Sequence, residues 1–251
     1  MTEFKIKVAD RIAAVRALYP STRDCCRDYL CDAEPDFAVE ISVTDIAFER
    51  EKSAQEDRLE GIPVRKFTDA YLETIAVQRK ITESLFAYDT LLFHGSVVAV
   101  DGEGYLFTAK SGTGKSTHTR LWREVFGERA VMINDDKPFL QMTENGVLAC
   151  GSPWNGKHGL GNNLCVPLKA VCILERGEEN RIRQISAKQA LPMLVQQSNR
   201  PLSGKWMPKY LEMLDKLAGS VAFYCLGCNM EPQAALVSYQ AMSGRGKDEE
   251  T

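Results

Sequence analysis

The chain has 251 residues, 44% of them hydrophobic and 26% charged, which is the composition of an ordinary globular protein. A formal net charge of −3 excludes a general attraction to nucleic acid or to an anionic membrane surface. No apolar run reaches the ~18 residues of a membrane-spanning helix, and Met1–Lys5 lacks the apolar core of a secretory signal. We therefore expect a cytoplasmic protein with no nucleic-acid partner and no membrane partner.

The spacing of the eight cysteines does not indicate a disulfide framework. Cys150, Cys165 and Cys172 stand in apolar, strand-like contexts, and we expect them to be core thiols. Cys225 and Cys228 form a lone C-x-x-C, without the second pair of ligands that a zinc site needs. Free thiols agree with a reducing cytoplasm.

The first part of the chain predicts a small α/β lobe. Alternating residues over Phe4–Val8 favour a half-exposed strand, and we expect a second strand over Phe37–Val43. Helices are expected over Arg11–Leu18, Arg23–Leu30 and Thr68–Phe86, with a solvated helix or loop over Ala47–Leu59. No linker marks a boundary. We place it near Tyr88, which gives a lobe over residues 1–88 and a second domain over residues 89–251.

The second part predicts many short strands with few helices between them. A buried strand over Leu92–Val100 and a turn lead to a strand over Tyr105–Thr108 that ends in a loop. The other expected strands are Arg129–Asn134, Pro138–Met142, Val147–Cys150, Lys169–Leu174, Arg181–Ile185 and Val221–Leu226, and the expected helices are Lys115–Phe126, Ala187–Gln197, Trp206–Leu217 and Pro232–Met242. Gly244–Thr251 is polar, and we expect a frayed end. This pattern indicates an α/β fold with a mixed sheet.

The run Ala109–Thr117 (AKSGTGKST) has the sequence of a phosphate-binding loop between a strand and a helix. Its glycines let successive backbone N–H groups point inward at a polyphosphate. Lys115 would reach the β- and γ-phosphates, and the hydroxyl of Ser116 would hold Mg²⁺. The predicted nucleotide-binding residues are Ser111, Gly112, Thr113, Gly114, Lys115, Ser116 and Thr117. Ala109 departs from the usual first glycine, and a Gly/Ser turn before an ordinary helix is the alternative.

Asp135 and Asp136 follow the loop by about one helix and one strand, where a nucleotide-binding fold places its metal-binding aspartate. One carboxylate can hold Mg²⁺ while the other takes the proton from an attacking hydroxyl. A solvated Asp-Asp turn is the alternative.

Histidines and a glycine-rich loop supply further candidates. His94 lies one hairpin before the phosphate loop, and either packs in the core or faces the nucleotide. His118 is expected to be structural or on the surface. Lys157 and His158, between glycines, would contact a phosphate or substrate, or belong to a mobile surface loop.

These residues carry a resemblance. The runs FHGS at 93–96, SGTGKS at 111–116, the aspartate pair at 135–136 and GLG at 159–161 are similar, in order and spacing, to those of HPr kinase. That kinase shares its P-loop fold with ATP-dependent phosphoenolpyruvate carboxykinase. The resemblance covers roughly residues 91 to 176 and implies a mixed-sheet P-loop kinase core of that type. It implies His94 beside the transferring phosphoryl group, Asp136 as base and Asp135 on the metal.

Two departures from the kinases stand out. They carry Glu-Ile-Arg ahead of Gly-Leu-Gly, whereas Gly156, Lys157 and His158 stand here, so the acidic residue that assists the metal is missing. The basic C-terminal loop that grips HPr is not found either. HPr is therefore not the expected acceptor, and the chain is more similar to related kinases that act elsewhere, some of them on peptides.

The sequence thus predicts a kinase that uses ATP and Mg²⁺ to phosphorylate a hydroxyl, expected to be a serine in a peptide or protein. Arg176 and Lys157 are candidate cations for the transferred group. A kinase of a small hydroxylated metabolite is one alternative, and a nucleotide-binding regulatory protein without transfer activity is another. A homo-oligomer is left open.

Overall fold

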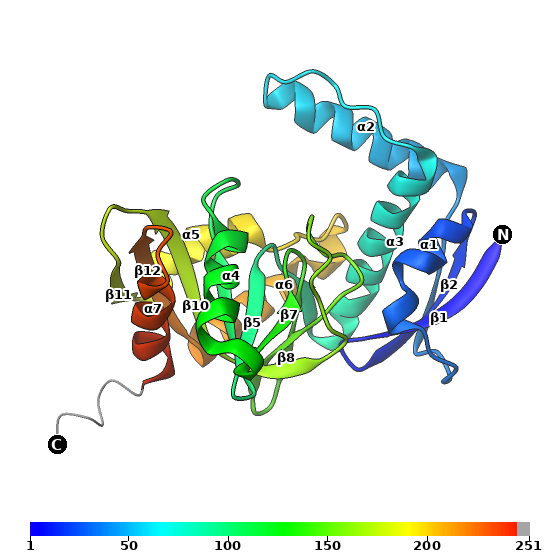
Figure 1. Cartoon of the computed structure of the whole chain (residues 1–251). Helices are drawn as coiled ribbons and strands as arrows, with labels where there is room; N and C mark the ends of the chain where they lie inside the picture. Colours follow the sequence, from blue (N-terminus) through cyan, green and yellow to red (C-terminus); the bar gives the residue numbers. More distant parts are fainter. Residues whose placement is uncertain (245–251) are drawn as a thin grey trace. The chain divides into compact units, whose positions relative to one another are not determined.

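The computed structural model describes residues 1–244, so the expected frayed end lies outside the described residues apart from Gly244. The chain divides into two compact units, Met1–Leu85 and Phe86–Thr251 (Figure 1). Within the described residues, no helix has both the length and the apolar character that crossing a bilayer requires.

The first unit contains a three-stranded sheet in the order β1-β2-β3. β1 (Thr2–Val8) confirms the predicted strand and forms an antiparallel hairpin with β2 (Arg11–Ala17). The helix expected over Arg11–Leu18 is therefore wrong. Burial alternates along β2 with the period of a strand, and the two turn residues Ala9 and Asp10 have φ of 46° and 57°, as a tight hairpin requires.

Helices complete this unit. β3 (Phe37–Glu40) is shorter than the expected strand, because Ser42 caps the next helix. The helix expected over Arg23–Leu30 is wrong, since α1 (Pro20–Cys25) ends before a short 3₁₀ helix. The helices of the first unit are α1, η1 (Arg27–Tyr29), α2 (Val43–Leu59) and α3 (Asp69–Leu85).

The second unit is built on a nine-stranded mixed sheet. Its strands are β4 (Thr90–Leu92), β5 (Ser96–Val100), β6 (Glu103–Thr108), β7 (Ala130–Asn134), β8 (Phe139–Thr143), β9 (Gly146–Cys150), β10 (Cys165–Arg176), β11 (Arg181–Ile185) and β12 (Ala222–Cys228). The mixed α/β architecture is confirmed. The single strand expected over Leu92–Val100 is wrong: Phe93 N and His94 N donate instead to Pro138 O and Gln197 O, which separates β4 from β5.

Strand direction brings several loops to one edge of this sheet. β6, β10 and β12 are parallel, and β5 lies antiparallel to both β6 and β7. The carboxyl ends of β6, β7, β10 and β12 therefore share an edge with the beginning of β5. Polar residues that follow or precede these strands can meet there, as in other α/β proteins.

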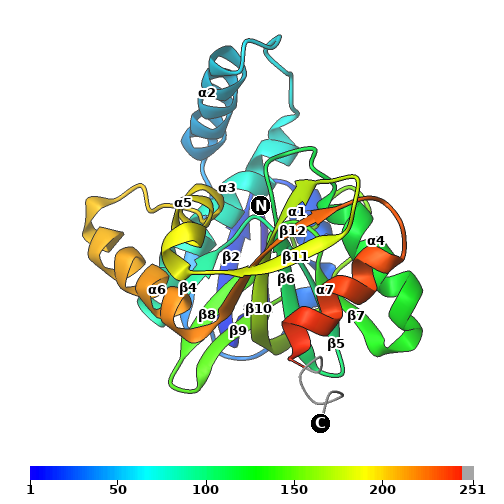
Figure 2. The ribbon, with the colours of Figure 1, turned by 90° about the vertical axis from the view of Figure 1, so that its left-hand side faces the viewer.

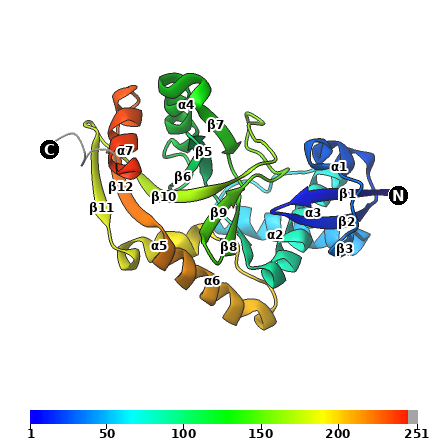
Figure 3. The ribbon, with the colours of Figure 1, turned by 90° about the horizontal axis from the view of Figure 1, so that it is seen from below.

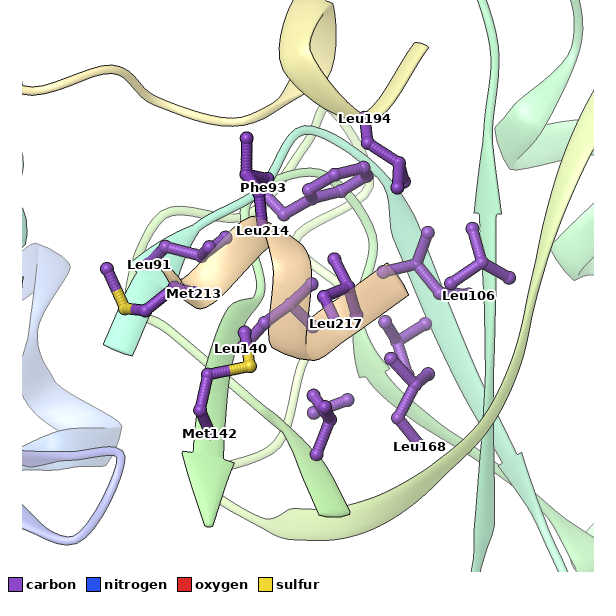
Figure 4. Close-up of a cluster of buried hydrophobic side chains, with 14 of the residues drawn as sticks. Leu91, Phe93, Leu106, Leu140, Met142, Leu168, Leu194, Met213, Leu214 and Leu217 are labelled. Carbon is purple, nitrogen blue, oxygen red and sulfur yellow. The ribbon is translucent and has the colours of Figure 1, made fainter. Parts of the chain in front are cut away.

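Helices cover both faces of the sheet (Figures 2 and 3). α4 (Lys115–Phe126) and α7 (Gln233–Ser243) lie over one face, with α5 (Ala187–Gln197) and α6 (Met207–Ser220) over the other. Met213, Leu214 and Leu217 of α6 pack on sheet residues such as Leu140 (Figure 4). Short 3₁₀ helices over Phe86–Tyr88, Gly127–Arg129 and Gly204–Trp206 join these elements. Two apolar layers thus hold the sheet edge rigid beneath its loops.

A disulfide corrects the prediction for two cysteines. Cys150 and Cys165 are bonded to each other, at paired positions where β9 meets β10, and Cys165 is exposed. Only Cys172 of the three expected core thiols is a buried free thiol. The bond closes the segment of residues 151–164, called here the 151–164 loop. Cross-strand pairing decided this outcome, which residue spacing alone does not show.

The disulfide should stabilise the second unit measurably. For a sequence separation of 15 residues, closing the loop is worth about 3 kcal/mol of unfolding free energy. We expect Cys165→Ser and reduced wild type to share one lowered Tm, with no further response of the variant to reductant. Alkylation of denatured, unreduced protein should label six of the eight cysteines. A wild-type Tm that does not change when reductant is added would contradict the presence of this disulfide.

Candidate functional site

The predicted phosphate loop joins β6 to α4 at the shared sheet edge. Gly112 and Gly114 have φ of 75° and 119°, values that residues other than glycine rarely adopt. Gly114 is also the N-cap of α4. Thr113 donates its backbone N–H to Lys110 O at 3.2 Å, which tightens the turn. Ala109, in place of the usual glycine, is fully buried in the core beneath the loop. The methyl group therefore packs in the core.

Lys115 begins α4 and is half-buried, with its Nζ 3.4 Å from Ala109 O. Burial lowers the pKa of its ammonium group, the charge of Asp136 raises it, and the charge of Lys137 lowers it further. The net direction is downward, as expected of a cation in a partly desolvated pocket. The negative charge of a bound polyphosphate would favour the protonated form of Lys115.

A cavity of about 550 Å³ opens on one side of this loop. The cavity is lined by loop and helix residues Gly112, Thr113, Gly114 and Thr117, together with Arg176 at the end of β10 and Asn229 after β12. Arg176, a candidate cation for the transferred group, donates from Nη2 to Gly112 O at 2.7 Å and so lies against the loop. The volume of this cavity is in the range of small-molecule binding sites.

Asp135, directly after β7, is 5% exposed. Its Oδ1 accepts the backbone N–H of Gly156 at 2.6 Å, whereas Oδ2 is buried and, among the described residues, has no hydrogen-bond partner. A second cavity of about 90 Å³ is lined by Asp135 together with Ser116 of α4. A Cβ at residue 156 would lie 3.1 Å from Oδ2, so glycine leaves room for the carboxylate.

These oxygens fit a magnesium ion. Mg²⁺ takes hard oxygen ligands and is commonly held by one or two carboxylates together with waters and substrate phosphates. The buried Oδ2 of Asp135 lacks the partner that such an oxygen needs, and Ser116 faces the same cavity. No cluster of three or more His, Cys, Asp or Glu residues within residues 1–244 forms a closed metal site.

His94 and Asp136 form a pair at the same edge. His94 lies between β4 and β5, and its Nε2 is 3.2 Å from Asp136 Oδ1. Thr108 at the end of β6 donates to His94 O at 3.1 Å, and Gly95 N donates to Asp136 O at 3.0 Å. The His94 side chain is 32% exposed. The histidine is therefore not a core residue.

The environments of the two aspartates move their pKa values in opposite directions. Burial raises the pKa of Asp135, outweighing the N–H groups of Gly156 and Leu160 that lower it. Burial also acts to raise the pKa of Asp136. The hydrogen bond from His94 and nearby positive charges outweigh that effect, and its pKa lies below the usual value. Neighbouring carboxyl groups whose pKa values differ in this way can take different roles in acid–base chemistry.

The remaining candidates divide. His158 lines the small cavity with Ser116 and Asp135, whereas Lys157 is exposed and is not among the residues lining it. Of the two roles expected for His118, structural or on the surface, the structure shows the first. The side chain is 2% exposed and accepts from Trp122 Nε1 at 3.1 Å, and burial lowers its pKa to about 4.

Sequence reasoning missed two contributors. The comparison with the kinases identifies Gly156 only as the place of a missing acidic residue, whereas its N–H donates to Asp135. Asn134 was read as the last residue of a buried strand, although its side chain bonds to the turn of Asp136 and to the 151–164 loop. An asparagine at the end of an apolar strand, next to two aspartates, is the signal that could have pointed to it.

The fold and this grouping define an α/β protein with a candidate phosphate-binding and acid–base site at one sheet edge. The chain belongs to the family of SynChlorMet cassette protein ScmC, whose model matches residues 64–231, a range that contains every predicted site residue. No curated protein matches the chain. Among solved structures, the HPr(Ser) kinase/phosphatase from Coxiella burnetii is similar over 63% of this chain and 94% of that chain. Its identity is 13% and the TM-score is 0.38, a distant structural similarity.

Proposed function

We propose that this chain is an ATP- and Mg²⁺-dependent kinase of the HPr-kinase type that phosphorylates a hydroxyl, a serine in a peptide or protein. The observation that carries the proposal is a convergence at one sheet edge. The predicted phosphate loop, the buried unpartnered oxygen of Asp135 and the His94–Asp136 pair all lie there.

Each group has a separate task in this reaction. The loop N–H groups and Lys115 bind the phosphates. Ser116 and Asp135 would hold Mg²⁺, which would supply neutralisation of phosphate charge. Asp136 accepts the proton of the acceptor hydroxyl. As it does so, the hydroxyl oxygen bonds to the γ-phosphorus, and the bond between the γ-phosphorus and the bridging oxygen of the β-phosphate breaks, which releases ADP. His94 keeps Asp136 ionised and oriented. The 550 Å³ cavity receives the nucleoside.

The experiment is a transfer assay with γ-labelled ATP and Mg²⁺ against serine-containing peptides, proteins and hydroxylated metabolites. Label should appear on serine and be absent with Lys115→Ala. Label found only on metabolites would show that the acceptor is a small hydroxylated metabolite rather than a peptide or protein serine. Failure to bind MgATP in calorimetry would overturn the proposal.

A nucleotide-binding protein without transfer is the second candidate. It is favoured by Gly156, which stands where the kinases carry an acidic residue that assists the metal. MgATP binding with no label transfer across the whole panel would select it.

The His94–Asp136 pair predicts a shift in pH dependence. Asp136 must be ionised to accept a proton, so activity is lost as pH falls through its pKa. His94→Ala removes the hydrogen bond that lowers this pKa, the pKa rises, and activity is lost at a higher pH than in wild type. Initial rates across pH measure the shift.

A matched variant isolates the hydrogen bond. His94→Gln keeps an N–H donor near the position of Nε2 and should retain more activity than His94→Ala. Both should melt close to wild type, because the side chain is one-third exposed. A lower Tm with unchanged turnover and pH profile would assign His94 a packing role only.

A further inference from the structure

Asn134 is a buried polar residue to which the proposed mechanism gives no task. It is 0% exposed and ends β7, directly before the two aspartates. The pairing of β5 with β7 shifts register here: Val97 pairs with Asn134, but Val98 pairs with Met132. Such irregularities bend a strand and redirect its side chains, often beside active sites.

The side chain of Asn134 uses its full hydrogen-bonding capacity. Its Oδ1 accepts from Asp136 N at 2.9 Å and from Lys137 N at 2.6 Å. Its Nδ2 donates to Ser152 O at 3.1 Å and to Asn155 Oδ1 at 3.0 Å, and lies 3.2 Å from Ser152 Oγ. N–H donors on one side and oxygen acceptors on the other fix the orientation of the amide.

This one amide therefore ties two separate segments together. On one side is the turn that places Asp136 against His94. On the other is the 151–164 loop, whose Gly156 N–H holds Asp135 at 2.6 Å. Oxygen acceptors surround Nδ2, so a carboxylate of the same shape would be repelled there, and a small apolar residue would leave several buried groups unpaired.

We propose that Asn134 is a positioning residue for the reaction: it couples the turn of Asp136 to the 151–164 loop and so holds both carboxylates in working geometry. This inference rests on the proposed kinase function. Asn134 touches neither nucleotide nor acceptor and acts through the two aspartates.

The chain offers a matched control at Asn162. Its Nδ2 donates to Met132 O at 2.8 Å, so it also anchors the 151–164 loop to β7, but at a point within the strand rather than at the aspartate turn. If Asn134 only anchors the loop, Asn134→Ala and Asn162→Ala should behave alike. If Asn134 couples the loop to the turn, only Asn134→Ala should impair the chemical step.

The kinetic test compares these variants by kcat and by the Kd of MgATP. For Asn134→Ala we expect kcat to fall about 10²-fold, because displacing a reacting group by ~1 Å can cost that much, while Kd changes less than about threefold. Asn162→Ala should stay within about twofold in kcat. Equal losses in both variants, or a lower Tm with wild-type kcat in Asn134→Ala, would overturn the proposal.

A second variant guards against misfolding. Asn155→Ala removes one loop partner of Asn134 and leaves the aspartate turn intact. It should lower kcat by about tenfold, as the loss of one hydrogen bond in a network predicts, without loss of MgATP binding. Wild-type kcat in this variant, if Asn134→Ala does not fold, would count against the coupling.

Amide hydrogen exchange, resolved by NMR without nucleotide, separates this proposal from the kinase assignment. Asn134 does not contact the Gly156 N–H, which bonds to Asp135. Coupling predicts faster exchange at Gly156 in Asn134→Ala, and wild-type exchange at Asp136 in Asn162→Ala. Unchanged Gly156 exchange refutes the coupling. A wild-type protein that transfers no phosphoryl group refutes the function and leaves the exchange result to stand by itself.

Discussion

Lys115→Ala should abolish the proposed phosphoryl transfer, lowering kcat by at least about 10²–10³-fold, the typical cost of removing one group that stabilises transition-state charge. The lysine begins α4 and its pKa is lowered chiefly by burial, so its charge is held in a partly desolvated site. Lys115 is a half-buried polar residue at the start of the helix, so the Tm should stay near that of wild type. Labelled ATP with the identified acceptor provides the rate.

Lys110→Ala is the matched control for charge. Lys110 lies in the same loop but is exposed, and its backbone oxygen, which the substitution keeps, makes the bonds to Thr113. This variant should keep near-normal turnover. Near-normal turnover in a folded Lys115→Ala variant would instead refute the interpretation of residues 109–117 as a phosphate-binding loop.

Asp136→Asn should still bind MgATP and lose about 10²–10⁴-fold in kcat, the usual contribution of a general base. The amide has the shape of the carboxylate, so the contact with His94 and the fold should persist. It cannot accept the proton of the attacking hydroxyl. Single-turnover rates with saturating MgATP measure the chemical step directly.

Asp135→Asn separates the two carboxylates. Asp135 lines a cavity with Ser116, and its buried Oδ2 lacks a partner among the described residues. We therefore expect the Mg²⁺ concentration needed for activity to rise, while binding of ATP alone changes little. Wild-type turnover in Asp136→Asn combined with an inactive Asp135→Asn would reverse the two roles. Activity in both variants would contradict the resemblance to the kinases.

Local chemistry made part of this fold predictable. The helix over Lys115–Phe126 was confirmed at both ends, because Gly114 and Gly127 adopt backbone conformations that end regular structure. The strand over Arg181–Ile185 and the helix over Ala187–Gln197 were also confirmed. The order of loop, helix, strand and aspartates followed from spacing alone.

Pairing partners distant in sequence explain the errors. Arg11–Leu18 contains residues that favour a helix in isolation, but the hairpin with β1 overrides that weak preference. Cys150 and Cys165 were assigned to the core because their neighbours are apolar, yet strand pairing set them opposite each other. Local composition carries no information on register between strands.

By itself, the sequence determined the candidate loop, the residue types of the site and the mixed α/β class. These depend on backbone preferences and on patterns within about twenty residues. Only the tertiary structure decided that His94 meets Asp136, that Arg176 reaches Gly112, and that Asn134 joins the aspartate turn to the 151–164 loop. Such contacts arise because strand direction brings distant ends to one sheet edge, where buried polar groups must find partners.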